Sequence, residues 1–383
     1  MKKQNIKTLY YFSNELIPSP MACTIQQMHM CQAFQQTGLK TTLVRPWFFS
    51  DAVKKPDSFG YYDIQVEFEI VRLPSLMSLS KPASGKKMRI PAIGGFSLMW
   101  SIRRFLDTLR RDNKLDHAVI YSRNLNAALV ALNTVNKTPV WFEAHAMHEP
   151  LPRFRRVLEQ VTGVVTISSL LRNDLAEMVS EKKVMVVEPD GVDEKRLYQK
   201  IPQDLAKRQL GLKERFCAVY TGKAYAGKGV DIILDAARQM PQVQFVLVGT
   251  GSLIHSDNVI CLDYVPPAQV QLYQCAADVV LLPNTESGPI HRYTSPLKLF
   301  EYMAANRPII ASDIPVFKDV LVHQENALLF KAGNSRALVA AIETLYHNRH
   351  VGKDLCRKSR EQIDSYTFQN RARRIRHLME THV

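Results

Sequence analysis

The chain has 383 residues, 46% of them hydrophobic, and 50 basic against 36 acidic residues give it a net charge of +14. This length exceeds what one compact core usually takes and predicts two domains. The longest apolar runs are too short for a membrane-spanning helix, and the run Leu9–Phe12 behind the basic N-terminus is too short for a signal sequence.

The six cysteines are scattered and show no C-x-x-C spacing. They are expected to be small buried side chains in a reducing compartment, with neither a disulfide framework nor a metal site. The sequence therefore predicts a cytoplasmic protein.

Strands and helices alternate along the first half of the chain. Short apolar runs predict strands at 7–12, 40–45, 64–72, 117–122, 139–144, 163–167 and 184–188, and helical spacing predicts helices at 25–37, 97–111, 124–136 and 168–180. Such alternation requires parallel sheets covered on both faces.

A polar stretch at 193–214 is interpreted as a linker, after which the alternation resumes. Strands are predicted at 216–221, 245–248, 259–262, 279–282 and 308–311, with helices at 229–240, 267–275, 296–304, 334–348 and 368–382. The predicted fold class is α/β, with two doubly wound parallel-sheet domains at 1–195 and 196–365 and a C-terminal helix at 366–383 that packs back on the first domain.

The segment from Thr294 to Asp313 is the most informative part of the sequence. Ser295 is a predicted N-cap, and Pro296 suits the first helical position. Glu301 then stands one turn into a helix whose N-terminus could face an anion, so its carboxylate could bind both hydroxyls of a ribose. The alternative is a solvated surface glutamate.

The turn from Gly222 to Gly229 lies between a predicted strand and a predicted helix, where anion sites are common. Gly222 allows close backbone approach, and Lys223 and Lys228 could neutralise much of a diphosphate. The turn matches neither a Walker loop nor G-x-G-x-x-G. A flexible basic surface turn is the alternative.

His145 and His148 follow a predicted strand and are flanked by Glu143 and Glu149. The segment lacks a helical H-E-x-x-H, so a zinc site is not expected. Polar side chains at the carboxyl end of a strand favour a binding role, although an isolated histidine is more often structural.

Basic residues cluster in the first domain on both sides of an apolar stretch at 90–100. The basic residues are Lys86, Lys87, Arg89, Arg103, Arg104, Arg110, Arg111, Arg153, Arg155 and Arg156, and the apolar residues include Phe96, Leu98, Met99 and Trp100. This combination suits an anionic membrane surface. Nucleic acid is not expected, because no nucleic-acid-binding motif is found.

Together these segments resemble the retaining GT-B glycosyltransferases of family 4 (glycosyl transferases group 1). Residues 163–168 look like the family's strand ending in serine, and 188–193 are similar to its P-N-G-V-D turn, with Asp190 in place of asparagine. Residues 222–229 resemble its G-R-x-x-x-x-K-G loop, with Lys223 in place of arginine. Residues 300–308 match its E-A-M-A-x-G-x-P segment.

The resemblance implies an N-terminal acceptor-binding domain and a C-terminal domain that binds a UDP- or GDP-linked sugar. It implies catalytic roles for His145, Lys223, Lys228 and Glu301, with His148 as the alternative histidine. Donor contacts would come from Gly222, Lys223, Lys228, Thr294, Ser295, Leu297, Lys298 and Glu301. No cofactor or metal is expected beyond the donor itself.

Two features depart from the family pattern. Tyr293 stands where a second glutamate is usual, and small side chains at 19–24 replace the N-terminal glycine-rich loop. The expected function is sugar transfer with retention to a glycan or lipid-linked acceptor of a surface polysaccharide, lipopolysaccharide or glycolipid. The enzyme would work peripherally on the inner face of the cell membrane. A nucleotide-sugar epimerase and a non-catalytic sugar-binding or regulatory homologue remain alternatives.

Overall fold

The computed structural model describes residues 5–48, 51, 57–76, 91–147, 151–198, 201–251, 256–285 and 292–382. The chain divides into two compact units, one made of Met1–Pro189 and Phe368–Val383, the other of Asp190–Thr367. The division therefore falls six residues before the predicted boundary at 195, and the C-terminal helix is part of the first unit.

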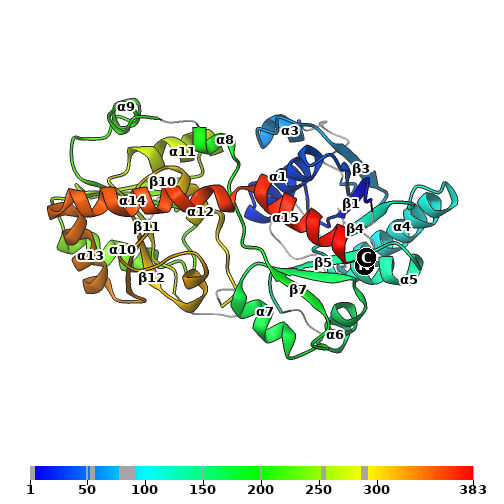
Figure 1. The fold of residues 1–383 in the computed structure, drawn as a ribbon. Helices are drawn as coiled ribbons and strands as arrows, with labels where there is room; N and C mark the ends of the chain where they lie inside the picture. Colours follow the sequence, from blue (N-terminus) through cyan, green and yellow to red (C-terminus); the bar gives the residue numbers. More distant parts are fainter. Residues whose placement is uncertain are drawn as a thin grey trace. The chain divides into compact units, whose positions relative to one another are not determined.

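The first unit is built on a seven-stranded sheet in the order β3-β2-β1-β4-β5-β6-β7 (Figure 1). Its strands are β1 (Thr8–Phe12), β2 (Lys40–Pro46), β3 (Glu69–Leu73), β4 (Ala118–Ser122), β5 (Val140–Ala144), β6 (Gly163–Thr166) and β7 (Val184–Val187). Every neighbouring pair is parallel. β1, β4, β5 and β6 are almost entirely buried, as expected for parallel strands covered on both faces.

Helices connect these strands. They are α1 (Ala22–Gln36), α3 (Ser58–Tyr61), α4 (Pro91–Arg111), α5 (Leu125–Thr134), α6 (Leu151–Gln160), α7 (Ser169–Ala176) and α15 (Phe368–Thr381). α1 buries Met28, Cys31, Ala33 and Phe34 against the rest of the first unit. α15 lies beside α1 (Figure 1), where the rings of His29 and Phe368 stack 5.4 Å apart.

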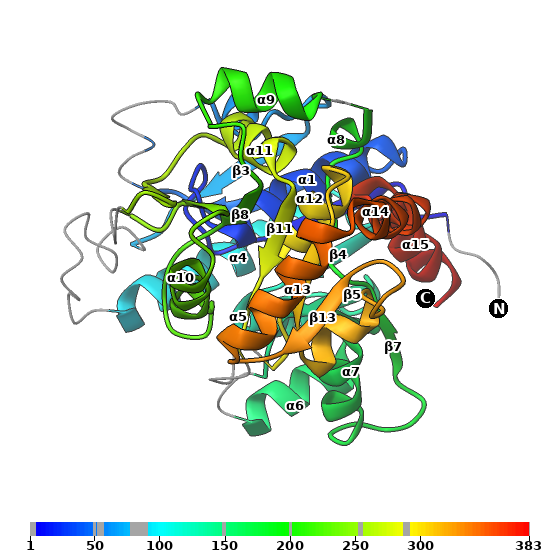
Figure 2. The same cartoon turned by 90° about the vertical axis from the view of Figure 1, so that its left-hand side faces the viewer.

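The second unit has a six-stranded sheet in the order β10-β9-β8-β11-β12-β13, again with parallel neighbours. Its strands are β8 (Cys217–Thr221), β9 (Gln244–Val248), β10 (Val259–Leu262), β11 (Val279–Leu282), β12 (Ile309–Asp313) and β13 (Leu328–Lys331). Its helices are α8 (Lys195–Tyr198), α9 (Gln203–Gln209), α10 (Val230–Gln239), α11 (Pro267–Ala276), α12 (Leu297–Ala304), α13 (Ser335–His347) and α14 (Arg349–Ile363). Figure 2 shows α13 beside β13.

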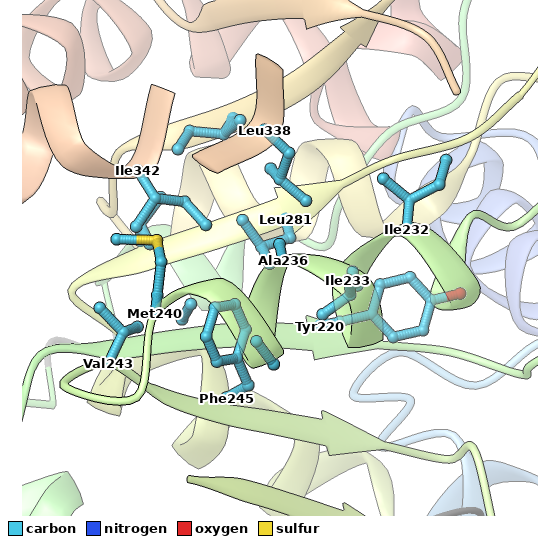
Figure 3. Packing of buried hydrophobic residues seen from close by; sticks show 14 of the residues in the cluster. Tyr220, Ile232, Ile233, Ala236, Met240, Val243, Phe245, Leu281, Leu338 and Ile342 are labelled. Carbon is cyan, nitrogen blue, oxygen red and sulfur yellow. The ribbon is translucent and has the colours of Figure 1, made fainter. Parts of the chain in front are cut away.

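The core of the second unit forms where α10 and α13 pack against its sheet (Figure 3). Phe245 and Leu281 contribute from the strands, Ile233 and Met240 from α10 and its end, and Leu338 from α13. All five are fully buried. This core supports the carboxyl ends of β8 and β11, where the candidate site begins.

The predicted α/β class with two doubly wound parallel sheets is confirmed. Several segments differ from the prediction. The sequence did not predict α3, β13 or α14. The predicted linker contains α8 and α9, and α9 is anchored by the buried Lys207 and Ala206. The segment of α6 was predicted only as a basic cluster, and its basic residues alternate with the buried Phe154, Val157 and Leu158. α4 begins at Pro91 and not at Ser97.

Candidate functional site

The second unit reverses its strand order between β8 and β11. Ligands of doubly wound sheets bind in the crevice at such a reversal, outside the carboxyl ends of the strands. Gly222 follows β8 directly, and Pro283 and Asn284 follow β11. The predicted phosphate loop therefore starts at the position where the fold favours ligand binding.

Gly222 leaves room for the side chain of Lys298. Its φ is +139°, and a Cβ on this residue would collide with Lys298 Nζ. The ammonium is buried and has no hydrogen-bond partner in the part of the chain that the structure describes. Burial, followed by the charge of Lys228, lowers the pKa of Lys298 to about 7, against the opposing effect of Glu301. An unpaired buried cation of this kind is a ready partner for an anion.

The loop after Gly222 carries the two predicted phosphate-binding lysines. Lys223 is exposed, and its carbonyl accepts a hydrogen bond of 3.0 Å from the Tyr220 hydroxyl. Lys228 is half-buried, with its ammonium 5.2 Å from the Tyr225 ring centroid. Gly229 then starts α10 at a φ of +68°, where a Cβ would collide with the Pro283 carbonyl.

The helix α12 begins at Leu297, one residue later than predicted. Pro296 is the N-cap, so the prediction of Ser295 as N-cap is wrong. Ser295 Oγ instead accepts a hydrogen bond of 2.9 Å from the backbone N–H of Asp190. Thr294 is half-buried, and Leu297, Phe300, Met303 and Ala304 face the core.

Glu301 is not the lone carboxylate that the sequence suggested. Its Oε1 lies 3.3 Å from Arg196 Nη1, and its Oε2 accepts a hydrogen bond of 3.0 Å from Gln274 Nε2. Its side chain is 20% exposed, so a ligand can still reach it. Sequence reasoning missed Arg196, because the segment around it was interpreted as a linker.

Gln274 and Tyr302 connect this glutamate to the end of β8. Gln274 Nε2 also donates to Thr221 Oγ1 at 3.2 Å, and the Tyr302 hydroxyl accepts from the Thr221 N–H at 2.9 Å. Both side chains are buried. Thr221 immediately precedes Gly222, so the network fixes α12 and Glu301 relative to the phosphate loop.

Two more polar side chains at this edge of the sheet have no partner among the described residues. Both the amide oxygen and the amide nitrogen of Asn284 are buried without a hydrogen bond, and so is Ser312 Oγ at the end of β12. Sequence reasoning missed both. The sequence signal that could have indicated Asn284 and Ser312 is a polar residue at the carboxyl end of a buried strand. Buried unsatisfied groups of this kind are rare in native folds and mark places where a ligand can bind.

The first unit places His145 directly after β5. Its side chain is 21% exposed, and its Nε2 lies 2.6 Å from Oε1 of the fully buried Glu143. His148, the alternative histidine, lies outside the described residues. The first unit thus holds one predicted site residue, while the second unit brings Gly222, Lys223, Lys228, Lys298 and Glu301 to one edge of its sheet.

An apolar stripe runs along α4 in the first unit. Ile93, Phe96 and Trp100 are exposed at helical spacing, and the exposed Arg103 and Arg104 follow them. The guanidinium of Arg104 lies 4.7 Å from the centroid of the Trp100 ring. Leu98, which the sequence grouped with the surface residues, is buried. Lys86, Lys87 and Arg89 lie outside the described residues.

A pocket of about 490 Å³ adjoins this stripe. It is lined by Trp47, Arg72, Pro74, Ser75, Leu76, Ser97, Trp100 and Ser101.

None of the described helices is both long and apolar enough to cross a bilayer. All six cysteines are free; four of them are buried, and Cys23 and Cys356 are half-buried.

The comparisons with known proteins match the second unit most directly. The model of the family "Glycosyl transferases group 1" matches residues 215–348, which include the phosphate loop and Glu301. Among curated relatives, the phosphatidyl-myo-inositol mannosyltransferase of Mycobacterium leprae is 27% identical over 237 residues, or 58% of this chain and 60% of the relative. The processive diacylglycerol alpha-glucosyltransferase of Acholeplasma laidlawii is 24% identical over 214 residues, 51% of this chain and 62% of the relative. The matched part is thus less than two thirds of these relatives' length.

Solved structures match nearly the whole fold. HepE of Anabaena in complex with UDP has a TM-score of 0.74 at 14% identity, covering 98% of this chain and all of its own. The sucrose-phosphate synthase of Thermosynechococcus elongatus has a TM-score of 0.73 at 18% identity, covering 98% of both chains. Identities this low establish the fold alone, which is GT-B. The chain thus has the GT-B fold of two doubly wound domains, and its residues 215–348 match the glycosyl transferases group 1 model.

Proposed function

We propose that this protein transfers a sugar, with retention of configuration, from a UDP- or GDP-linked donor to a glycan or lipid-linked acceptor. The observation that carries the proposal is the buried, unpaired ammonium of Lys298 beside Gly222 at the strand-order reversal of the second unit. An uncompensated buried charge is costly unless a ligand pairs with it. The diphosphate of a nucleotide sugar has the charge and size to do so.

The lysines near Gly222 would stabilise the leaving nucleotide. Lys298 and Lys228 are close enough for their charges to interact, and Lys223 follows Gly222 on the exposed side of the loop. Preorganised cations aimed at a diphosphate stabilise the charge that develops as the bond to the sugar breaks. Lysine supplies point charges where arginine would offer a bidentate fork. This mechanism needs no metal ion.

Glu301 would bind the ribose hydroxyls. Arg196 and Gln274 hold its carboxylate in place, and its exposed edge remains open to a ligand. Thr294, Ser295 and Leu297 precede it at the start of α12, where backbone N–H groups can donate to an anion. A donor with a UDP group is supported by the HepE structures, which were solved with UDP and with UDP-glucose.

His145 would hydrogen-bond the transferred sugar or the acceptor hydroxyl. The experiment that tests the whole proposal measures donor affinity and sugar transfer separately with purified protein and a panel of nucleotide sugars and acceptors. Lys228→Ala should lower turnover strongly, whereas His145→Ala should reduce transfer more than donor binding. Chelators should leave activity unchanged. Activity that survives in Lys228→Ala, or that a chelator abolishes, would contradict the diphosphate mechanism.

A non-catalytic sugar-binding homologue is the second candidate, favoured by one observation. Tyr293, which stands where the family usually has a second glutamate, is only 7% exposed. A protein that binds nucleotide sugars but releases neither nucleotide nor glycosylated product with any acceptor would favour this candidate. Conversion of the donor into an isomeric nucleotide sugar would instead indicate an epimerase.

A lipid-linked acceptor is supported by the first unit and by the relatives. The exposed stripe Ile93, Phe96 and Trp100 continues into Arg103 and Arg104, a combination that suits the interface of an anionic membrane. By their names, the two curated relatives act on phosphatidyl-inositol and diacylglycerol lipids. We therefore propose peripheral docking on the inner face of the cell membrane, in the synthesis of a surface polysaccharide, lipopolysaccharide or glycolipid.

A further inference from the structure

The carboxylate of Glu143 is a buried hub at the centre of the first unit. It lies on β5 and is completely inaccessible to solvent. Its Oε1 accepts hydrogen bonds from Gln26 Nε2 (2.9 Å) and Arg371 Nη2 (3.2 Å), and its Oε2 accepts one from the Tyr121 hydroxyl. These donors come from α1, α15 and β4, so three separate elements converge on one carboxylate.

Arg371 already compensates the charge of Glu143. It is fully buried, and its Nε and Nη2 also donate to the carbonyls of Glu188 and Pro189, which fix the guanidinium against the end of the sheet. Burial alone would raise the pKa of Glu143, but Arg371, followed by His145, holds it well below its usual range. The carboxylate is therefore an anion at every pH near neutral.

Gln26 is fixed in turn by Arg123. Arg123 Nη1 donates to Gln26 Oε1 at 2.6 Å, which directs the Gln26 amide nitrogen at Glu143. Gln26 is buried as well. A chain of hydrogen bonds from Arg123 through Gln26 therefore holds Oε1, the same carboxylate oxygen that His145 contacts.

His145 is partly open to solvent, whereas Glu143, Arg371, Gln26 and Tyr121 are buried. Its ring is 21% exposed, yet its Nε2 lies 2.6 Å from Glu143 Oε1. The pair of Glu143 and Arg371 is charge-balanced without it. The contact is therefore not needed to balance the charge of the buried pair. Its main effect is to orient the His145 imidazole, as carboxylates do in other sites.

We infer that Glu143 is a positioning residue for His145. It holds the ring in one orientation, keeps the proton of the neutral ring on Nε2 and thereby makes Nδ1 the acceptor, and it stabilises the imidazolium when the ring is protonated. The inference rests on the proposed function, in which His145 acts at the sugar or the acceptor. A carboxylate that sets the tautomer of a functional histidine controls turnover more than binding.

The direct test reads the tautomer of His145 by two-bond ¹H–¹⁵N correlation spectroscopy over a pH series. The resonance is assigned by its loss in His145→Ala. In the wild type, the neutral ring should carry its proton on Nε2. In Glu143→Gln the preference should be lost. In parallel, kcat for transfer should fall about tenfold to a hundredfold, the range seen for partners that orient a ligating histidine, while KM for the donor changes less than about threefold.

Glu188→Gln is the matched control. Glu188 is also a buried glutamate that binds an arginine of α15, with its oxygens 2.7–3.0 Å from Arg374, and no histidine of the described residues bonds to its carboxylate. This variant should leave the His145 tautomer and kcat unchanged. Glu143→Asp keeps the charge and should recover part of the rate. If Glu143→Gln fails to fold because Arg371 is left uncompensated, the double variant with Arg371→Gln restores neutrality for the same measurements.

Three results would overturn the inference: a neutral wild-type ring protonated on Nδ1, a folded Glu143→Gln protein with unchanged tautomer and kcat, or an equal loss of kcat in Glu188→Gln. The spectroscopic result does not depend on activity. A ring protonated on Nε2 in a protein that transfers no sugar would support the positioning role and count against the proposed function alone.

Discussion

The ammonium of Lys298 lies 4.0 Å from the centre of the Tyr220 ring. The ring face attracts the cation but offers no hydrogen bond. The lysine is thus held in a buried position with its three donors unused among the described residues. The pKa of Lys298 is about 7, so near neutral pH an anionic ligand can shift the lysine from its neutral to its protonated form.

Nucleotide binding should therefore be accompanied by proton uptake. At pH 8 about nine tenths of a lysine with this pKa is neutral, and a bound diphosphate should restore the charge. Calorimetry in buffers of different ionisation enthalpy should show uptake approaching one proton per nucleotide. Lys298→Met should abolish the uptake and weaken binding roughly tenfold to a hundredfold. The exposed Lys331→Met is the control.

The same lysine should affect stability in a defined pH window. Its folded pKa lies below its ordinary value of 10.5, so the unfolded chain binds more protons between these values. The free energy of unfolding of the wild type should therefore rise between about pH 7 and pH 10 relative to that of Lys298→Met. Equal pH profiles for the two proteins would contradict a buried, partly neutral lysine.

Glu301→Ala should weaken UDP binding about tenfold to a hundredfold, the cost of losing charge-assisted hydrogen bonds of about 1.5–3 kcal/mol. The loss should disappear with 2′,3′-dideoxy-UDP, because this ligand lacks the hydroxyls that the carboxylate is proposed to bind. Isothermal titration of both ligands, with the exposed Glu325→Ala as control, makes the comparison. An equal loss for the two ligands would assign Glu301 to holding Arg196 and not to the ribose.

Gly222→Ala should reduce nucleotide affinity at least tenfold, because the new Cβ occupies the space of Lys298 Nζ. The residue also has a positive φ, which strains any L side chain. Gly333→Ala separates the two effects, since Gly333 has a φ of +75° and no atom near its Cβ position. Thermal unfolding should show that both variants are destabilised by backbone strain. Nucleotide titration should show a loss of affinity only in Gly222→Ala.

Membrane docking through α4 should depend on its exposed aromatic residues. Phe96→Ser with Trp100→Ser should reduce sedimentation with vesicles, and binding by the wild type should grow with anionic lipid content and fall with salt, because each basic residue near such a surface contributes about 1 kcal/mol. Tyr264→Ser, at another exposed aromatic residue, is the control. Wild-type binding that ignores lipid charge and salt would favour a soluble acceptor.

Local sequence signals predicted most strands and many helices of the fold. Buried strands such as β8 and β11 are short apolar runs between polar turns, and their ends were predicted to within one residue. Asn124 and Asn334 cap their helices with side-chain hydrogen bonds, as such residues commonly do. α9 was missed because its few buried positions lie in a polar stretch. The ammonium of the buried Lys207 pairs with Asp278 at 2.8 Å and donates to the Arg215 carbonyl at 3.1 Å, which no local pattern predicts.

Sequence reasoning indicated residues of the candidate site but not their partners. Gly222 and Glu301 belong to local motifs, whereas Lys298 came from the family resemblance, and the roles of all three stay predictions. The pairing of Glu301 with Arg196 arises from tertiary packing within the second unit, and no local sequence pattern predicts it. The same holds for Glu143 and Arg371, which are 228 residues apart in the chain.

That separation has a consequence for biosynthesis. The sheet that contains Glu143 is complete once β7 has left the ribosome, but the carboxylate lacks its ion pair with Arg371 until α15 emerges after the entire second unit. Domains generally fold as units in the order of their synthesis. Here the unit that begins the chain is completed last. His145 therefore gains the complete hydrogen-bond network around Glu143 only when the translation of both units is essentially over.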